Sequence, residues 1–448
     1  MKTLPLEFIE RMKSFPDLDF DAFISSYDGA PARSLRANRH KITPDALKRV
    51  FPLGDNVGFA SDGFFFDFDG IGNHPLHHAG AFYVQEPSAM MPVSLLSDIR
   101  LPDSPRILDT CAAPGGKTSQ LADLITGDGF ILSNEVVPKR AKILASNIER
   151  LGIRNAVVSC LDTSTLAELF PGAFDVVLVD APCSGEGMMR RDDVAVSEWS
   201  PENVTRCAER QKKILSDAVK TLAPGGYLIY STCTFSMEEN EDNLEWLLDN
   251  YPFLETLPPP EAVRRNTADG LKGFVHARRF YPHLSRGEGQ FAVLLKNTLS
   301  GERNSFALFR GDRITGRTEG IVRDFLSGLL GEESSRLSLC ASGDRIIILP
   351  CDLPLVPKSI MTGVELGTVE KGRLEPHHRF FSAYGAEMLN KHELTDPEAK
   401  AYIRGLTFEC GDFGGFGAVL YRGCAVGGVK ISGGIAKNHY PKGLRTMS

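Results

Sequence analysis

The sequence predicts an α/β protein built on a central parallel sheet, with smaller regions before and after it. Between residues 105 and 300, short apolar runs alternate with segments of helical periodicity. The runs typical of buried strands are RILDTCA, FILSNE, AVVSCLD, DVVLVDAP, YLIYSTC and QFAVLLK. The segments typical of helices are SQLADLI, KRAKILASNIERLG, RQKKILSDAVKTL and EENEDNLEWLLDNY. This alternation indicates βαβ units and a parallel sheet that is covered by helices on both faces.

Length and composition indicate more than one domain. The chain has 448 residues, which exceeds the usual size of one domain, and 42% of them are hydrophobic, enough for real cores. The composition changes after Lys296, where a polar stretch follows the last predicted strand of the sheet. We expect an N-terminal α+β domain, a central α/β domain, a linking α+β domain and a β-rich C-terminal module, over residues 1–95, 96–298, 299–378 and 379–448.

Cysteine usage and hydropathy exclude several classes of protein. The nine cysteines are odd in number and form no C-x-x-C pair, so neither a disulfide scaffold nor a zinc ribbon is expected. No run of about twenty apolar residues predicts a membrane span, and the N-terminus MKTLPLEFIERMKSF lacks the apolar core of a signal peptide. We therefore expect a cytoplasmic protein with free thiols. No metal is expected, because the histidines of NHPLHH and His377-His378 lack matching cysteines or acids.

Charge is distributed unevenly along the chain. The formal net charge is −7, which speaks mildly against a nucleic-acid partner. However, residues 413–448 contain no acid and carry Arg422, Lys430, Lys437, Lys442 and Arg445. A second basic stretch near the N-terminus contains Arg33, Arg36, Arg39, Lys41, Lys48 and Arg49. Either stretch alone is as consistent with solvated surface charge as with a binding surface.

A glycine-containing turn, LDTCAAPGGKTSQL, follows the first strand of the predicted sheet. The strand ends at Asp109 and a helix begins near Thr118, so main-chain N–H groups between them are available to a ligand. The turn consists of Cys111, Ala112, Ala113, Pro114, Gly115, Gly116 and Lys117. A Walker A loop would need glycine at position 111, and a nicotinamide fingerprint would need G-x-G-x-x-G. Neither pattern is present.

Acids end the next two strands. Glu135 stands twenty residues beyond Gly115, where an acid is placed to accept hydrogen bonds from ribose hydroxyls. Asp162 ends the third strand, within reach of a nucleoside base. S-adenosylmethionine is the remaining cofactor that suits a glycine turn with acids on successive strands.

Two cysteines end the fourth and fifth strands, Cys183 in VLVDAPCSGEG and Cys233 in YLIYSTCTFS. Because ligands bind at the carboxyl ends of parallel strands, both thiols and Asp180 are predicted at the edge that carries the turn. Thiols there suggest covalent catalysis on an electrophilic ring carbon. After Cys233, Ser236 and Glu239 form an S-x-x-E pattern that predicts a capping box opening an acidic helix. The thiols expected to be inert are Cys160, Cys207, Cys340, Cys351, Cys410 and Cys424.

Five segments occur in an order that resembles the motif series of the Sun/nucleolar-protein family of RNA cytosine-5 methyltransferases. They are GAFYVQEPSAMMP, DTCAAPGGKTSQLA, DAPCSGEGMMRR, STCTF and RFYPHLSRGEGQFAV. The resemblance implies a Rossmann-like, S-adenosylmethionine-dependent methyltransferase domain. The C-terminal segments YIRG and GGVKISGGIAKNHYPKGLR resemble the RsmF type of bacterial ribosomal RNA methyltransferase. That similarity implies a PUA-like RNA-binding module over residues 379–448 and an RNA-binding role for residues 1–95.

The resemblance also implies roles for single residues. Cys233 would be the nucleophile that adds to carbon 6 of cytosine, after which carbon 5 takes the methyl group. Asp180 would hydrogen-bond the cytosine ring, and Cys183 would assist loss of the carbon 5 proton and release of the adduct. The cofactor would be lined by residues 111–117 with Glu135, Asp162 and Asp180. The residues alone leave the order of attack open, because DNA cytosine-5 methyltransferases attack from a Pro-Cys motif, which here selects Cys183.

RNA contacts are expected from basic side chains near the two thiols, namely Arg190, Arg191, Arg278, Arg279 and Arg286. The acid-free C-terminal stretch is expected to add an accessory contact. The expected function is methylation of carbon 5 of cytosine in RNA by a monomer, with small-subunit (16S) ribosomal RNA as the target. A transfer RNA cytosine-5 methyltransferase and a catalytically idle RNA-binding assembly factor stay open as alternatives.

Overall fold

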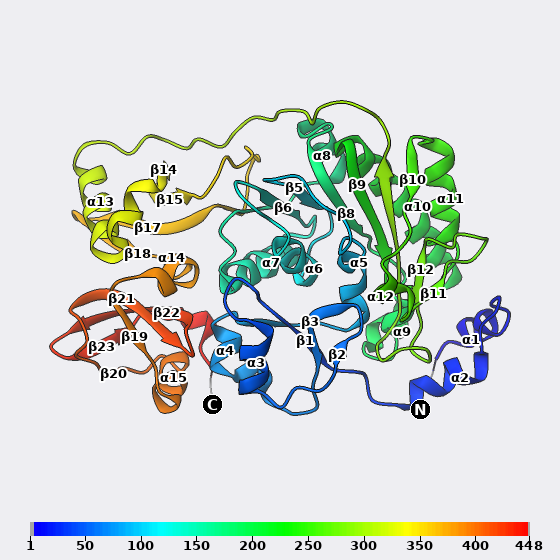
Figure 1. The fold of residues 1–448 in the computed structure, drawn as a ribbon, viewed down its shortest axis with the longest axis horizontal. Coiled ribbons are helices and arrows are strands. Elements are labelled where there is room, and N and C mark those ends of the chain that lie inside the picture. Colours follow the sequence, from blue (N-terminus) through cyan, green and yellow to red (C-terminus); the bar gives the residue numbers. More distant parts are fainter. Residues whose placement is uncertain (1–3, 447–448) are drawn as a thin grey trace.

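A computed structural model describes residues 4–446 of the chain. Within these residues the strands form four sheets, and the largest occupies the centre and right of Figure 1. The N-terminal sheet lies below it, and the two C-terminal sheets lie to its left. No helix within residues 4–446 is long and apolar enough to cross a membrane.

The largest sheet is built around five parallel strands: β5 (Arg106–Asp109), β6 (Phe130–Asn134), β7 (Ala156–Ser159), β8 (Phe174–Asp180) and β9 (Leu222–Thr232). Their order in the sheet is β9-β8-β5-β6-β7. From β5 the chain adds β6 and then β7 on one side, and it then crosses to the other side of β5 to add β8 and β9. Such a reversal opens a crevice at the carboxyl ends of the strands on either side of it. The predicted Rossmann-like sheet is confirmed.

The sixth predicted strand, β13 (Gln290–Asn297), differs from the parallel expectation. It runs antiparallel to β9 and to β12 (Arg278–Phe280). A parallel pair needs a crossover of a dozen or more residues, and the loop from β12 to β13 is shorter than that. The sheet is completed by β10 (Leu254–Thr256), β11 (Ala268–Asp269) and β16 (Met361–Thr362), with α12 (Glu261–Arg264) before β11.

Helices cover both faces of this sheet, as predicted. One face packs against α6 (Gly116–Ala122) and α7 (Pro138–Leu151), and the other against α8 (Thr163–Leu169), α10 (Pro201–Thr221) and α11 (Glu241–Asn250). Strand β5 shows the reason. Ile107 belongs to the first core and Leu108 to the second, because successive side chains of a strand point to opposite faces.

The N-terminal region is an antiparallel sheet of β1 (Ser34–Ala37), β2 (Asn56–Val57), β3 (Ala60–Phe65) and β4 (Phe82–Val84). Beside it lie α3 (Pro44–Val50) and α4 (Pro75–His78), whereas α5 (Met91–Ser94) packs against α6, β9 and β13 of the central domain. The first two helices, α1 (Leu6–Lys13) and α2 (Phe20–Ser25), lie at the far right of Figure 1, away from this sheet. They pack against the central domain near α9 (Asp193–Glu198).

The C-terminal part contains two sheets. The first has β14 (Ser338–Ser342), β15 (Arg345–Leu349), β17 (Val364–Glu370) and β18 (Arg373–Pro376), with α13 (Gly316–Leu330) beside it. The second has β19 (Lys391–Glu393), β20 (Phe408–Glu409), β21 (Gly415–Tyr421), β22 (Cys424–Ser432) and β23 (Ile435–Asn438). Two helices, α14 (His378–Tyr384) and α15 (Asp396–Ile403), complete this part.

The last sheet and the N-terminal sheet share one hydrophobic core. Leu35 and Phe82 of the N-terminal sheet belong to the same buried cluster as Tyr402, Val419 and Val426. In Figure 1 the two regions lie side by side, with α4 next to β22. Helix α14 packs against β22, β17 and α7, and so joins the C-terminal sheets to the central domain. The C-terminal module is thus held by apolar packing to parts of the chain that are distant in sequence.

This shared core predicts that damage to the N-terminal sheet loosens the C-terminal module. Phe82 is completely buried, whereas Val84 on the same strand is 42% exposed. Removal of a buried phenylalanine side chain costs about 3–5 kcal/mol of folding free energy. We expect Phe82→Ala to lower the melting temperature and to make the C-terminal module accessible to limited proteolysis, with Val84→Ala close to wild type. Equal proteolysis of both variants would contradict the shared core.

Candidate active site

The predicted cofactor turn lies at the carboxyl end of β5. Asp109 ends the strand, and Thr118 Oγ1 donates to its Oδ2 at 2.7 Å. Burial raises the pKa of Asp109 to about 7, and its Oδ1 is a buried acceptor without a partner among residues 4–446. Gly115 has a φ of 113°, and a Cβ there would come within 3.1 Å of Leu144 Cδ1. The turn therefore approaches α7 this closely only with glycine at this position.

Acids follow the carboxyl ends of the neighbouring strands. After β6, Glu135 is buried and accepts from Val137 N at 3.0 Å, and its Oε2 lies 3.1 Å from Arg140. Arg140 also donates to the carbonyl of Ala113 at 2.9 Å, which links Glu135 to the turn. Asp162 is exposed after β7. A glycine turn with acceptors on the next two strands fits the nucleoside of S-adenosylmethionine.

Cys183 and Cys233 lie together at the ends of β8 and β9. These strands are parallel neighbours with Asp180 opposite Ser231, and Ala181 N continues the pairing by donating to Ser231 O at 2.9 Å. The two Sγ atoms are 3.1 Å apart. The main-chain N–H of Cys233 also donates to Cys183 Sγ, at 3.3 Å. The register of two strands thus brings together thiols that are fifty residues apart in sequence.

Asp180 and Lys117 connect the thiols to the cofactor turn. Lys117 Nζ lies 2.7 Å from Asp180 Oδ2, and Ser231 Oγ and Gln290 Nε2 donate to Oδ1 at 2.7 and 3.3 Å. Burial lowers the pKa of Lys117, but the Asp180 carboxylate outweighs it and raises this pKa above its usual value. The lysine is therefore charged, and its charge also interacts with Cys233. The ammonium group thus lies between the cofactor turn and the thiols.

A buried carboxylate ties the loop after β8 to the loop after β9. Glu186 is fully buried, and its two oxygens accept four hydrogen bonds at 2.8 to 2.9 Å. The donors are Thr234 Oγ1, Phe235 N, Ser236 Oγ and Trp199 Nε1. A further main-chain bond runs from Gly187 N to Cys233 O at 2.9 Å. The positions of the two thiols therefore depend on hydrogen bonds between their loops.

Glu239 supplies a second link, and the predicted capping box is wrong. Helix α11 begins only at Glu241 and has no side-chain cap, while Ser236 donates to the carboxylate described above. Glu239 is buried and accepts from Ser184 N at 3.0 Å and from Gln211 Nε2 at 2.7 Å. Burial raises the pKa of Glu239 to about 7. The Glu239 carboxylate, which the sequence pattern assigned to the start of a helix, thus accepts hydrogen bonds from Ser184 and Gln211 instead.

The thiols of the site differ in their readiness to ionise. The pKa of Cys183 is raised well above its usual value, first by its hydrogen bond with Cys233 and then by burial. Cys183 therefore keeps its proton at neutral pH, and its sulfur is in hydrogen-bond contact with that of Cys233. In the cofactor turn, burial raises the pKa of Cys111 to about 12, so this thiol is not a nucleophile at neutral pH.

Three of the five arginines predicted to contact RNA are buried inside the protein, which corrects that expectation. The side chains of Arg278 and Arg279 are 2% exposed and that of Arg190 is 10% exposed. Their intramolecular partners are, in the same order, Asp269, Glu241 and Glu288. These guanidinium groups stabilise the loops around the site and have no surface left for a phosphate. Arg286 is exposed, and Arg191 is partly exposed.

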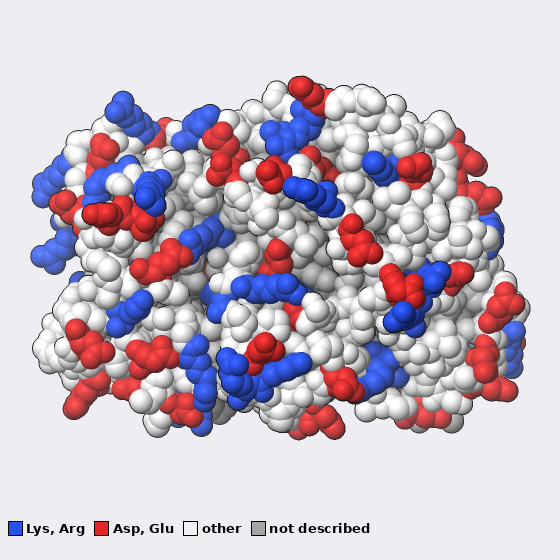
Figure 2. Space-filling model, viewed as in Figure 1, with Lys and Arg blue, Asp and Glu red and all other residues white. Residues whose placement is uncertain are grey.

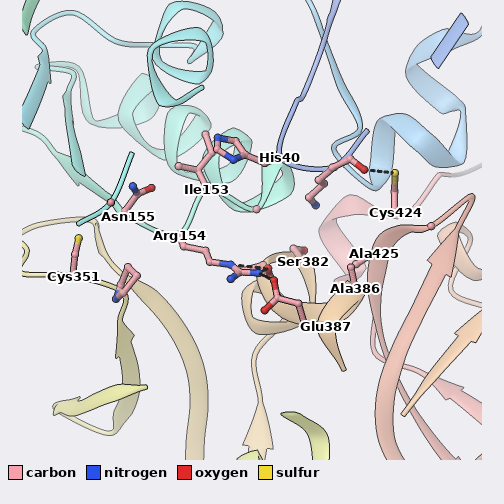
Figure 3. Close-up of a pocket in the computed structure, with 16 residues that line it drawn as sticks. His40, Ile153, Arg154, Asn155, Cys351, Ser382, Ala386, Glu387, Cys424 and Ala425 are labelled. Atoms are coloured by element: carbon pink, nitrogen blue, oxygen red, sulfur yellow. Dashed lines mark hydrogen bonds and ion pairs between the residues drawn. The ribbon is translucent and has the colours of Figure 1, made fainter. Parts of the chain in front are cut away.

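A cavity of about 390 Å³ lies near the opposite edge of the sheet, where β7 begins (Figure 3). It is lined by the segment before β7, by α14 and by the start of β22. Its basic side chains already have partners in the protein. Lys41 Nζ donates to the carbonyls of Ala79 and Arg150 at 2.7 and 3.2 Å, and Arg154 pairs with Glu387. Ligands of parallel sheets bind at the other edge, so this cavity is separate from the catalytic site.

The C-terminal module contains one group that the sequence analysis missed. His392, Cys410 and Asp412 place their possible ligand atoms within 4.8 Å of one another. Their sequence separations match no metal motif, so only the fold reveals the group. His392 Nδ1 is hydrogen-bonded to Asp412 Oδ2 at 2.6 Å. This hydrogen bond already engages one of the two ring nitrogens that could bind a metal.

This sheet order, with a glycine turn after its first strand, defines the chain as an S-adenosylmethionine-dependent methyltransferase. The crystal structure of a methyltransferase homologue from Pyrococcus horikoshii shares the fold, with a TM-score of 0.56 and 29% identity over 65% of this chain and 94% of that chain. NSun6 from Pyrococcus horikoshii, crystallised with SFG, has a TM-score of 0.58 at 20% identity and covers 66% and 99% of the two chains.

Sequence comparison shows the family. The family model "16S rRNA methyltransferase RsmB/F" matches residues 99–296, the RsmF N-terminal domain matches 4–87, and the RsmF PUA domain matches 389–446. Ribosomal RNA small subunit methyltransferase F of Shigella boydii is 32% identical, and that of Escherichia coli O17:K52:H18 is 31% identical. Both alignments cover 98% of this chain and 96% of the relative. The chain belongs to the RsmF type of the RsmB/F family of RNA methyltransferases.

The Glu186 link predicts a loss of activity without a loss of cofactor binding. Glu186→Gln replaces one acceptor oxygen by an NH2 group that faces hydrogen-bond donors, and leaving buried donors unpaired costs about 1–3 kcal/mol each. We expect methyl transfer to fall strongly while calorimetric affinity for S-adenosylmethionine stays near wild type. Glu198→Gln, at an exposed position of α9, is the control. Full activity of Glu186→Gln would show that the loops do not need this carboxylate.

Proposed function

We propose that this enzyme methylates carbon 5 of a cytosine in small-subunit (16S) ribosomal RNA through a covalent bond between Cys233 and the base. The observation that carries the proposal is the pair of thiols 3.1 Å apart, beside Asp180 and Lys117, at the edge of the sheet that bears the cofactor turn. Carbon 5 of cytosine is a weak nucleophile, and addition of a thiolate at carbon 6 divides one difficult step into two easier ones.

In this mechanism the residues have separate tasks. Cys233, whose sulfur is in contact with Cys183 and interacts with the Lys117 ammonium, attacks carbon 6 of a cytosine that has left its base stack. Asp180 holds the cytosine ring by a hydrogen bond to the polar edge of the base. S-adenosylmethionine, when bound, supplies the methyl group for carbon 5. Cys183, once it has given up its own proton, then takes the carbon 5 proton, and the electron pair left behind expels the sulfur of Cys233 from carbon 6.

The raised pKa of Cys183 supports this order of attack. A thiol that keeps its proton is a poor nucleophile, so Cys183 is the less suited of the two to attack the base. Attack by Cys183, the order implied by the Pro-Cys motif of DNA enzymes, would require this thiol to lose its proton first. We therefore propose Cys233 as the nucleophile and Cys183 as the residue of adduct release.

Replacing each cysteine separates the two roles. We expect Cys233→Ala to lose both methylation and the covalent RNA complex. Cys183→Ala should form the bond but release it slowly, so that an RNA–protein adduct accumulates on a denaturing gel. Cys351→Ala, a thiol in the linking region away from both loops, is the control and should behave as wild type. An adduct in Cys233→Ala and none in Cys183→Ala would reverse the roles.

The proposed RNA surface joins the N-terminal sheet to the C-terminal module, which share a core. Arg36 and Lys41 of the N-terminal basic stretch are occupied inside the protein, but Arg39, Lys48 and Arg49 are exposed. In the C-terminal module the exposed residues include Lys437 and Lys442. Figure 2 shows acidic and basic side chains interspersed over much of the face in view, with a group of basic ones at the lower centre, where Figure 1 shows α3 and α4. These cations are suited to contact RNA phosphates.

Salt dependence tests this surface. Each cation that contacts a phosphate contributes about 0.7–0.9 to the slope of log affinity against log salt. We expect Lys437→Ala with Lys442→Ala to weaken binding of a 16S ribosomal RNA fragment and to reduce that slope, as measured by fluorescence anisotropy. Lys220→Ala, on α10 in an ion pair with Asp217, should leave the slope unchanged. An unchanged slope in the double variant would remove these lysines from the RNA surface.

The proposal includes a monomer that acts in the cytoplasm, where ribosomal RNA is assembled. Bisulfite sequencing of ribosomal and transfer RNA from a deletion strain distinguishes the proposed target from the transfer RNA alternative. Loss of a methylated cytosine in 16S ribosomal RNA is the expected result. Loss confined to transfer RNA would move the substrate to that class, and no loss in either would favour an idle assembly factor.

A further inference from the structure

Cys183 and Cys233 are the one pair of thiols within residues 4–446 whose sulfurs are in hydrogen-bond contact. Both are partly exposed and neither is in a disulfide. Their Sγ atoms are 3.1 Å apart, and the sulfurs of a disulfide are about 2.05 Å apart. An approach of about 1 Å therefore separates the two thiols from bonding distance.

The two loops already hold the thiols in this contact. Gly187 N donates to Cys233 O at 2.9 Å, and the hydroxyls of Ser184 and Thr234 are hydrogen-bonded at 2.8 Å. Both hydrogen bonds cross between the loops within a few residues of the thiols. Loss of chain entropy usually opposes the joining of two distant cysteines. Here that loss has already occurred in folding, so a bond between the sulfurs requires little additional ordering.

The surroundings of the two sulfurs also differ. The Lys117 ammonium interacts with Cys233, and a thiol attacks a peroxide in its thiolate form. Cys183 lies beside it as a second thiol able to trap the oxidised sulfur. Partly exposed thiolates with a second thiol beside them are the usual sites of reversible oxidation. The sulfurs of the other partly exposed thiols, Cys111, Cys160 and Cys351, are hydrogen-bonded to Thr110 Oγ1 and to the carbonyls of Val136 and Gly129, in the same order.

We propose that Cys183 and Cys233 are a site of reversible oxidation by hydrogen peroxide, which joins them in a disulfide. The Cys233 thiolate attacks one peroxide oxygen, so that an S–O bond forms, the O–O bond breaks and hydroxide leaves. Cys183 then attacks the sulfur of this sulfenic acid, the S–S bond forms, the S–O bond breaks, and the oxygen departs with a proton as water. Two thiols lose two electrons in total, and one peroxide becomes two waters.

The disulfide would stop methyl transfer, a consequence that rests on the proposed function. With both sulfurs in one bond, no thiolate is available to add to carbon 6 of cytosine. A dithiol such as dithiothreitol reverses the change by exchange through a mixed disulfide and restores both thiols. The catalytic pair would thus also report the presence of peroxide.

Mapping of the cross-link tests the proposal directly. The reduced full-length enzyme is treated with increasing hydrogen peroxide, its free thiols are alkylated, and a non-reducing digest is analysed by mass spectrometry. The expected product links the peptides of Cys183 and Cys233 and is lighter than their sum by two hydrogens. Methyl transfer should fall in proportion to the linked fraction, and dithiothreitol should restore it.

Variants make the outcome specific. Cys351→Ser should still form the link, because its sulfur takes no part in the pair. In Cys183→Ser the link should be absent, and Cys233 should be oxidised further to a sulfinic acid that dithiothreitol does not reverse. Peroxide treatment that inactivates the wild-type enzyme without this link would overturn the proposal. If the reduced enzyme fails to methylate RNA, the proposed function fails, and the peptide map still decides whether the disulfide forms.

Discussion

The geometry of the loops that carry Cys183 and Cys233 depends on the buried Glu186 carboxylate and the four hydrogen bonds that it accepts. The pairing of β8 with β9 brings the starts of two loops together, but strand pairing ends at Ala181 and the thiols lie beyond it. Glu186 continues the connection through hydroxyl, main-chain and indole donors of the opposing elements. A buried carboxylate requires such donors, and the donors lose their partners if it is removed.

The N-terminal helices support the same loops from outside. Phe23 of α2 meets Phe235 edge to face at 5.2 Å, and Phe8 of α1 meets Trp199 at 5.7 Å. Arg190, in the loop after β8, donates to the carbonyl of Ser26 at 2.8 Å. Phe235, through its main-chain N–H, and Trp199, through Nε1, both donate hydrogen bonds to the Glu186 carboxylate. Helices α1 and α2 therefore help to determine the geometry of a candidate active site that lies more than 150 residues later.

Local features of the sequence predicted the central sheet, the cofactor turn and the edge on which the cysteines lie. Strand ends and glycine turns are encoded within a few residues, and the topology of a parallel sheet then places their carboxyl ends together. Partnerships between distant residues could not be predicted in this way. Ser236 and Glu239 have the spacing of a capping box, but buried donors and acceptors from other segments bind them.

The arginines show the same limit. Arg278 and Arg279 stand in a basic segment next to aromatic residues, a pattern typical of RNA contacts, yet β12 and its neighbours bury them against Asp269 and Glu241. The shared core of the N-terminal sheet and the C-terminal module had no sequence signal, because its members are over 300 residues apart. Burial is decided by which faces meet in the fold, and residue type alone does not reveal it.

The central claim is that Cys233 forms the bond to the base. A 16S ribosomal RNA fragment in which the target is 5-fluorocytidine tests it directly, because the fluorine at carbon 5 cannot leave as a proton and the adduct is trapped. Digestion and mass spectrometry of the wild-type complex then identify the linked peptide. Our account predicts the modified base on the peptide that contains Cys233. The base on the peptide that contains Cys183 would contradict it.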